Sequence, residues 1–358
     1  MRIVHADSAR TWRGGQNQVL LTSRGMAARG HEVWLACQDG GVLESRARAA
    51  GLAVRPMAFH GGFSPGAVMG LARLVRETHP DVIHLHDPHA VSTGLAASSL
   101  APGFRRMASR RVDFPLRGAL SRWKYGACRR VIAVSRAIAA QLEADGVPRD
   151  RIRVVYEGVP DRAAVGDGRR ALEALGVPTD APVVGNVAAL TGHKDHGTLL
   201  EAAVRVRRAL SQARFVIVGE GERRRELEER TRGLGLEDRV VFTGFRDDLD
   251  RLIPAFTVFC LSSHMEGLGT SLLDAMAFSR PIVATAAGGI PEAVEDRVTG
   301  RVVPPRNPEA LAEALVEVLG DAGMLRAMGA AGRRRFEQRF TADRMVEETL
   351  AVYAEHER

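Results

Sequence analysis

The chain contains few of the residues that cross-link proteins. Only three of its 358 residues are cysteines, and Cys37, Cys128 and Cys260 lie far apart among apolar neighbours. This distribution fits buried free thiols better than a disulfide framework or a metal site. We therefore predict three reduced, buried cysteines.

Long apolar runs are also missing. No stretch approaches the roughly 18 apolar residues that a membrane-spanning helix needs. The first seven residues have the pattern of a strand and lack the basic stretch and cleavage site of a signal peptide. The sequence thus predicts a cytoplasmic protein that can lie peripherally on the inner face of the cytoplasmic membrane.

Lysine is scarce although the chain is basic. Only Lys124 and Lys194 are lysines among 50 Lys and Arg residues. Since arginine is used almost everywhere that positive charge alone is needed, a retained lysine indicates a need for a compact point charge. Chance is the competing explanation.

Positive charge is concentrated in the first part of the chain. Residues 1–160 hold 23 Lys and Arg against 12 Asp and Glu, whereas residues 161–358 hold 27 against 31. The densest segment, 104–130, has aromatic side chains between its arginines, as in a helix that lies on an anionic membrane surface. A solvated helix face with core positions is an equal alternative. Nucleic acid is not expected as a partner, because no recognition motif accompanies the charge.

Short apolar runs alternate with helix-length amphipathic stretches, which predicts parallel sheets covered by helices. The alternation restarts after a loop-like segment near residues 157–180. We therefore expect an α/β protein with two doubly wound, Rossmann-like domains and a cleft between them. Ligands of such sheets bind at the carboxyl ends of the strands.

The strongest motif is Glu266-Gly-Leu-Gly-Thr-Ser-Leu-Leu-Asp274, which follows an apolar strand and opens a helix. The first-turn N–H groups lack partners within the helix, and Gly267 and Gly269 let a ligand approach the backbone. Glu266 and Asp274 lie on nearly the same helix face, where they can bind two sets of hydroxyl groups. In the alternative reading, Glu266 caps the helix and Asp274 is a surface acid.

With this motif the chain resembles the glycosyltransferases of family 4, which have the GT-B fold and an E-x7-E motif. The resemblance runs from the first strand to the last helix. It includes four further stretches: Trp12-Arg-Gly-Gly-Gln16, Val187-Ala-Ala-Leu-Thr-Gly-His-Lys194, Val218-Gly-Glu-Gly-Glu222 and Ala287-Gly-Gly-Ile-Pro-Glu292.

The resemblance implies a GT-B fold with an acceptor-side domain, residues 1–165 plus a C-terminal helix 341–358, and a nucleotide-sugar-binding domain, residues 166–340. It implies metal-independent transfer of a sugar, with retention, from a nucleoside diphosphate sugar to a glycan or lipid-linked acceptor. No cofactor or divalent metal is expected. Cell-envelope polysaccharide or lipopolysaccharide synthesis is the expected pathway.

The resemblance also assigns roles within the donor site. Glu266 contacts the donor sugar and Lys194 the diphosphate, both as catalytic residues, while Asp274, one methylene shorter than the usual Glu, holds the ribose. The other expected donor-binding residues are Gly14, Gly15, Phe245, Arg246, Gly267, Leu268, Gly269 and Thr270.

Two positions depart from the family pattern. Ala189 stands where relatives have a phosphate-binding arginine, and Arg110-Arg111 stands where many have a histidine near the reacting sugar. Arg111 is therefore a candidate catalytic residue, able to stabilise the departing phosphate or hold an anionic acceptor. The candidate acceptor-side residues are His86, His89 and Arg110.

Two further patterns suggest metal binding. The spacing of His84, His86 and His89 allows a metal site, but the resemblance argues against it. Asp248-Leu-Asp250 has the D-x-D form of other glycosyltransferases, yet its place at a helix start predicts first-turn acids that complement the helix dipole.

Rival functions stay open at this point. They are a nucleotide-sugar 2-epimerase of the same fold and a non-enzymatic protein that binds sugar nucleotides. A nicotinamide oxidoreductase is least favoured, because no G-x-G-x-x-G follows the first strand.

Overall fold

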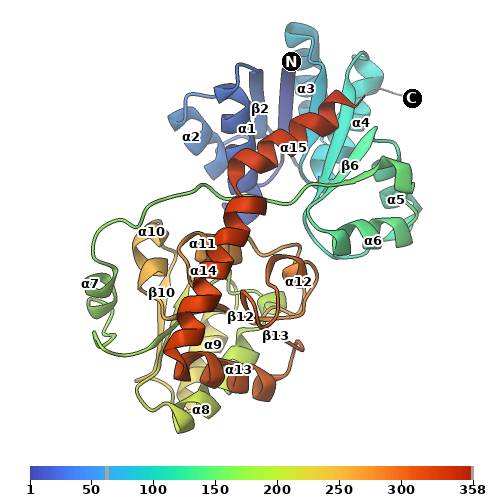
Figure 1. Cartoon of the computed structure of the whole chain (residues 1–358). Coiled ribbons are helices and arrows are strands. Elements are labelled where there is room, and N and C mark those ends of the chain that lie inside the picture. The colour runs from blue at the N-terminus through green and yellow to red at the C-terminus, as the bar shows by residue number, and fades with distance from the viewer. Residues whose placement is uncertain (61–63, 356–358) are drawn as a thin grey trace. The chain divides into compact units, whose positions relative to one another are not determined.

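The computed structural model describes residues 1–60 and 64–355 (Figure 1). It divides into two compact units. Unit 1 comprises Met1–Val159 together with the C-terminal helix α15 (Ala342–Ala354), and unit 2 comprises Pro160–Thr341. Unit 1 ends at Val159, a few residues before the expected 165. The Val159 carbonyl accepts a hydrogen bond from the N–H of Ala342, which joins the end of this segment to the start of α15.

Unit 1 contains a seven-stranded parallel sheet. All four residues of β4 are buried, as a sheet covered on both faces requires. The strand order changes direction between β1 and β4. In open α/β sheets, ligands bind at the carboxyl ends of the strands at such a point. In spatial order the strands are β3 (Ala53–Met57), β2 (Glu32–Gln38), β1 (Arg2–Asp7), β4 (Val82–Leu85), β5 (Arg105–Arg110), β6 (Arg130–Ala133) and β7 (Ile152–Val154).

The helices of unit 1 begin at local signals. Pro88 occupies the first position of α4 after the cap Asp87, and Ser135 caps α6. The helical elements are α1 (Gly14–Ala28), α2 (Val42–Ala49), α3 (Pro65–Thr78), α4 (Pro88–Leu100), α5 (Gly118–Gly126), α6 (Arg136–Ala144), the 3₁₀ turn η1 (Arg149–Arg151) and α15.

The C-terminal helix α15, red in Figure 1, packs against α1 near the N-terminus of the chain. Val346 and Tyr353 belong to the same buried cluster as Ile3 and Met26. A Cβ atom on Gly25 would lie 2.6 Å from Cγ2 of Val346, so glycine permits the close approach of the two helices. Burial of this apolar face holds the last helix in unit 1.

Unit 2 contains a six-stranded parallel sheet. In spatial order its strands are β10 (Val240–Gly244), β9 (Arg214–Val218), β8 (Val183–Val187), β11 (Val258–Leu261), β12 (Ile282–Thr285) and β13 (Gly300–Val303). Its helical elements are α7 (Gly168–Glu173), η2 (Gly192–Lys194), α8 (His196–Ala209), α9 (Arg224–Gly233), α10 (Leu249–Leu252), η3 (Ile253–Ala255), α11 (Thr270–Ala277), α12 (Ile290–Ala293), α13 (Pro308–Gly320) and α14 (Ala322–Arg339).

The basic segment 104–130 differs from the expected interfacial helix. Its first part is strand β5, in which Met107 and Ala108 are buried, and only α5 is helical. Arg105 and Arg106 at the start of β5 donate to the main-chain carbonyls of Tyr353, at 2.6 Å, and Ala127, at 3.2 Å. The sequence pattern does not separate a strand with arginines at its start from a basic helix, because both interleave Arg with apolar residues.

All three cysteines are buried free thiols, which confirms the prediction. Among the residues that the structure describes, no helix is long and apolar enough to cross a membrane.

Candidate active site

The carboxyl end of β11 in unit 2 leads directly into the strongest sequence motif. The four residues of β11 are buried, and α11 begins at Thr270 after the cap residue Gly269. Gly269 has a φ of 89°, and a Cβ atom there would lie 2.9 Å from Cδ1 of Leu272. Glycine is therefore required for the turn that presents the first-turn N–H groups of α11 beyond the end of the strand.

Lys194 lies next to this turn. It ends η2, which follows β8, and its Nζ forms an ion pair with Oε2 of Glu266. Ser263 Oγ also donates to Oε2 of Glu266, at 3.2 Å. Because β8 and β11 are neighbouring parallel strands, their carboxyl ends bring together two charged residues that are 72 positions apart.

The loop that carries Lys194 is fixed to the loop after β11. Ser262 Oγ donates to the carbonyls of Lys194 and Asp195, at 3.1 and 3.0 Å. His264 N donates to the carbonyl of His193, also at 3.0 Å. The two loops therefore form one preorganised surface, while the Lys194 and Glu266 side chains keep 17% and 12% of their area exposed.

Asp274 lies on α11, two turns beyond Glu266. Its Oδ1 accepts a hydrogen bond of 2.8 Å from Nη2 of Arg162. Burial raises the pKa of the Asp274 carboxyl to about 6, although the ion pair with Arg162 opposes this shift. Sequence reasoning missed Arg162, because it lies 112 positions away in the segment that opens unit 2 and belongs to no motif.

Phe245 and Arg246 follow β10. The Phe245 side chain is exposed, as a ring that stacks on a ligand must be in the free protein. Both carboxylate oxygens of Asp248 accept hydrogen bonds from Arg246, at 2.8 and 2.7 Å. Asp248 thus forms an ion pair at the N-cap position of α10, and Asp250 lies in the first turn of that helix, as the sequence predicts for an acid that complements the helix dipole.

The second set of candidate residues lies at the carboxyl ends of β1, β4 and β5 in unit 1. The helix α1 starts at Gly14, and a Cβ atom on Gly15 would lie 3.9 Å from Cδ of Arg111. Gln16, in the first turn of α1, donates from Nε2 to Asp7, at 3.2 Å. Burial, and to a lesser degree the negative charge of Asp87, raises the pKa of the Asp7 carboxyl to about 6. The glycine turn and Arg111 are therefore neighbours.

Arg111 is held from two sides. Its Nε donates to Oε1 of Glu157, at 3.0 Å, and its Nη1 donates to Nδ1 of His86, at 3.1 Å. Only 14% of the Arg111 side chain and 10% of the Glu157 side chain are exposed. Since the guanidinium is already oriented, little side-chain freedom remains to be lost when it binds an anion.

The hydrogen bond from Arg111 determines the tautomers of a buried histidine chain. Nδ1 of His86 accepts from Arg111, so Nε2 of the neutral ring carries the hydrogen and donates to Nδ1 of His5, at 2.8 Å. Burial lowers the pKa of His5 to about 3 and the pKa of His86 well below its usual value. Both rings therefore stay neutral through the physiological range.

The histidines whose spacing allows a metal site do not all cluster in the structure, where His5 stands in place of His89 beside His84 and His86. His5, His84 and His86 can each offer a nitrogen to one ion. His84, however, uses both nitrogens in hydrogen bonds, to the hydroxyl of Tyr353 at 2.5 Å and to Oγ of Ser109 at 2.7 Å. With the nitrogens of His86 engaged as well, we interpret the cluster as a hydrogen-bonded support.

The remaining acceptor-side candidates are separate from Arg111. Arg110 is buried, donates to the carbonyl of Phe114 and stacks over the ring of Tyr125. His89 is exposed in the first turn of α4, where its N–H is bound by the cap residue Asp87. His86 and Arg111 are thus in contact, whereas Arg110 points into the packing beside α5.

Two family models match the chain, and together they cover nearly all of it. The model described as Glycosyltransferase Family 4 matches residues 12–162, and the model described as Glycosyl transferases group 1 matches residues 169–335. The chain belongs to glycosyltransferase family 4. The Lys194–Glu266 pair and the Arg111–Glu157 pair both lie within the matched residues.

Curated relatives of this family 4 glycosyltransferase include a D-inositol 3-phosphate glycosyltransferase of Salinispora tropica, 38% identical over 226 residues. That match covers 57% of this chain and 46% of the relative, so the chain spans about half of its length. The lipopolysaccharide core biosynthesis glycosyltransferase LpsE of Rhizobium meliloti is 28% identical over 283 residues, with 78% of each chain covered.

Solved structures show the same GT-B fold. The crystal structure of Anabaena HepE in complex with UDP-glucose matches with a TM-score of 0.87 and 22% identity, over 98% of this chain and 100% of that chain. At this identity the match establishes the fold of this family 4 glycosyltransferase and leaves its substrates to be inferred from its own residues.

Proposed function

We propose that the protein is a retaining, metal-independent glycosyltransferase that moves a sugar from a nucleoside diphosphate sugar to an acceptor hydroxyl. The observation that carries this proposal is the contact between Lys194 and Glu266 beside the open turn of α11. A departing diphosphate gains negative charge in the transition state. A fixed ammonium and free backbone N–H groups are the groups that stabilise such charge.

Each donor-site residue has a distinct proposed task. Lys194 binds the diphosphate, and Glu266, once released from the ion pair, accepts hydrogen bonds from the donor sugar. The amides at Gly267, Leu268, Gly269 and Thr270 bind phosphate and sugar oxygens. Asp274 binds the ribose while Arg162 keeps its carboxylate oriented. Phe245 and Arg246 lie beside the base.

Metal independence is supported by the pairing of the acids. Glu266 is paired with Lys194, Asp274 with Arg162 and Asp248 with Arg246. A divalent cation needs carboxylates that are not already compensated by a basic partner. The positive charge that a metal supplies elsewhere is supplied here by Lys194.

Arg111 is proposed as the corresponding cation of unit 1. Its guanidinium is held by Glu157 and His86 next to the Gly14-Gly15 turn, where it can hold a phosphate of the donor or an anionic acceptor. His89, exposed at the start of α4, is the proposed contact for the uncharged part of a glycan or lipid-linked acceptor. The name of the relative LpsE makes lipopolysaccharide synthesis the first pathway to test.

A membrane surface is proposed to bring in the acceptor. The side chains of Phe114, Leu120 and Trp123 are 45%, 68% and 61% exposed, and Arg117 and Arg122 are exposed among them. Apolar side chains flanked by arginines are suited to an anionic lipid surface on the cytoplasmic side. Wild type should sediment with phosphatidylglycerol vesicles but not with phosphatidylcholine vesicles. A Leu120→Ser/Trp123→Ser variant that sediments equally well would contradict the assignment.

The decisive experiment combines donor screening with product analysis. A thermal-shift panel of nucleotides identifies the base, with UDP first because the HepE structure holds UDP-glucose. The matching nucleotide-sugar is then incubated with acceptor extracts, and NMR of the product is expected to show the anomeric configuration of the donor. Full activity in EDTA is expected as well. An epimerised donor in the absence of acceptor, or an inverted product, would overturn the proposal.

A further inference from the structure

Unit 2 contains a cavity at the end of its sheet opposite the donor motif. The cavity has a volume of about 760 Å³ and lies where β11 and β12 begin, next to Thr257 and Pro281. The donor motif follows the other end of β11. The helix α11 starts at Thr270, within the donor motif, and ends at Ala277, just before the cavity residue Ser279.

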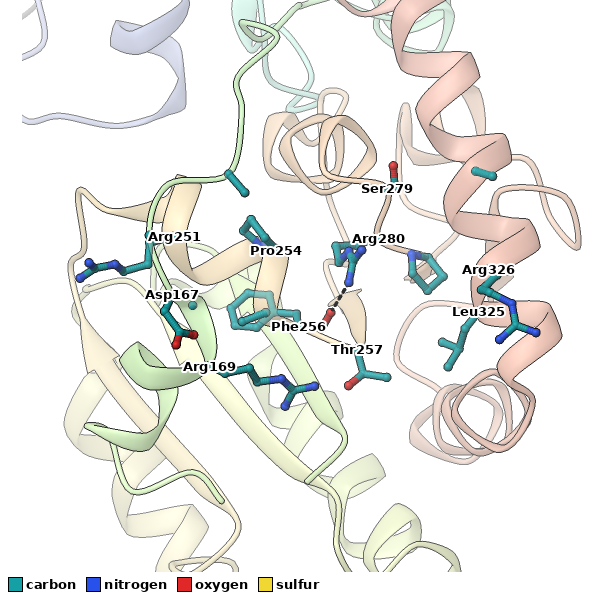
Figure 2. Close-up of a pocket in the computed structure, with 16 residues that line it drawn as sticks. Asp167, Arg169, Arg251, Pro254, Phe256, Thr257, Ser279, Arg280, Leu325 and Arg326 are labelled. Atoms are coloured by element: carbon teal, nitrogen blue, oxygen red, sulfur yellow. Dashed lines mark hydrogen bonds between the residues drawn. The ribbon is translucent and has the colours of Figure 1, made fainter. Parts of the chain in front are cut away.

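Two arginines approach this cavity from different elements, as Figure 2 shows. Arg169 comes from α7, and Arg280 comes from the turn between α11 and β12. The other two lining arginines, Arg251 and Arg326, are exposed and point away from the centre in Figure 2. The positive charge that faces the cavity therefore comes from one pair of half-buried arginines.

The two central arginines bind only main-chain carbonyls among the described residues. Arg169 donates to Ala181, at 3.1 Å, and Arg280 donates to Phe278, at 2.9 Å, and to Phe256, at 3.1 Å. Asp167 is the one carboxylate in the described cavity lining, and its Oδ1 caps α7 through the N–H of Arg170. Burial, and to a lesser degree the charge of Arg169, lower the pKa of Arg280. The like-charged pair is therefore uncompensated.

Close packing fixes the walls of the cavity. A Cβ atom on Gly168 would lie 2.3 Å from the carbonyl oxygen of Arg251, so α7 is in direct contact with the chain around α10. A Cβ atom on Gly329 would lie 2.3 Å from the carbonyl oxygen of Ser279, so α14 packs on the turn that carries Arg280. Ser279 itself has a φ of 56°, an uncommon conformation for serine. The arginine pair is thus held in place by the fold.

We propose that this cavity is a binding site for a small phosphate ester, separate from the donor site. Two guanidinium groups that converge without a carboxylate partner match the charge and the hydrogen-bonding geometry of a phosphate group. The volume lies in the range of small-molecule sites and exceeds what a bare phosphate fills. Pro254, Pro281 and Leu325 provide apolar surface for the organic part of the ester.

Calorimetric titration of the full chain with a hexose phosphate and with inorganic phosphate tests the proposal. Arg169→Gln and Arg280→Gln should each weaken binding of the hexose phosphate by at least about 10-fold. Arg326→Gln, on the rim of the same cavity, is the matched control and should bind like wild type. Lys194→Ala should also retain this binding, which separates the cavity from the donor site.

Either arginine variant is sufficient for the test. Arg169 donates one hydrogen bond to a main-chain carbonyl, so Arg169→Gln serves as the test even if Arg280→Gln does not fold. Tighter binding of the hexose phosphate than of inorganic phosphate supports an ester site, and equal affinity would overturn the assignment of an ester. Absence of binding to wild type, or unchanged affinity in Arg169→Gln, would overturn the proposal.

Discussion

The two units hold their candidate cations in different ways. In unit 2, Lys194 is paired with an acid that a ligand can displace, and both side chains keep some exposure. In unit 1, Arg111 is fixed between Glu157 and a neutral histidine chain that continues into the core. The first arrangement suits a group that exchanges one partner for a substrate. The second suits a group whose position must not change.

The comparison is tested most strongly at the lysine. Lys194→Ala should lower kcat by about 10²- to 10³-fold, because it removes a charge that acts on the leaving group in the transition state. Lys124→Ala is the matched control, since Lys124 is the other lysine of the chain and donates to Ser92 in unit 1. Steady-state kinetics of both variants are the measurement. Near-normal turnover of Lys194→Ala would remove its catalytic role.

Arg111 should give the next largest effect. Arg111→Gln removes the charge and should lower kcat/KM by about 10- to 100-fold, as the loss of one charge-assisted contact does. Glu157→Gln keeps the shape but loosens the guanidinium, and its smaller loss should be partly restored at high substrate concentration. Equal kinetics of Arg111→Gln and wild type would show that unit 1 supplies no charged contact.

The histidine chain can be tested through the C-terminal helix. Tyr353→Phe removes the hydroxyl bound to Nδ1 of His84 and leaves a buried nitrogen without that partner. The free energy of unfolding should fall by about 1–3 kcal/mol, as for other buried polar groups that lose a partner. Urea denaturation measures the loss. An unchanged midpoint would mean that α15 supports the cluster through apolar packing alone.

The smallest expected effect is the pH dependence that Asp274 gives to the stability of unit 2. The folded pKa of Asp274, about 6, lies above its usual value of 3.8, so the native state holds this proton more tightly than the unfolded chain does. The stabilisation is complete below about pH 4 and is lost as the pH rises through 6.

Relative to Asp274→Asn, wild type should therefore lose about 1 kcal/mol of stability between pH 5 and pH 7. The neutral histidines of unit 1 should contribute no such change, because burial holds the pKa of His5 near 3. Asp7 of unit 1, whose pKa is also raised to about 6, is present in both proteins and cancels in the comparison. Denaturation of both proteins at several pH values is the measurement. A parallel pH dependence in the two proteins would assign the effect to another group.

Much of the fold could be predicted from the sequence, because the central strands are apolar on both faces. The strands at 214–218 and 258–261 have the bounds that the apolar runs indicate. Three strands give no continuous apolar run: the edge strands β3, with Arg55 and Pro56, and β13, with Arg301, and the central strand β5, which begins with two arginines. An edge strand is partly solvated and has no continuous apolar run to reveal it.

The clustering of several candidate donor residues could be predicted for a similar reason. Glu266, Gly269 and Asp274 lie within nine positions of one another, so a single strand-to-helix turn places them together. That Lys194 lies near Glu266 agrees with the rule that parallel strands end at the same edge of a sheet, but the ion pair between them was not predicted from the sequence. For Arg162 and Glu157 no such rule exists, since they lie in irregular segments outside the motifs.

The sequence by itself determined the alternation of strands and helices, the free thiols and the motif at the carboxyl end of β11, because each depends on residues close together in the chain. Only the tertiary structure decided which partners hold Arg111 and which arginines approach the cavity beside Thr257 and Pro281. Such contacts join residues from separate elements, and burial and hydrogen-bond geometry between distant segments leave no periodic pattern in the sequence.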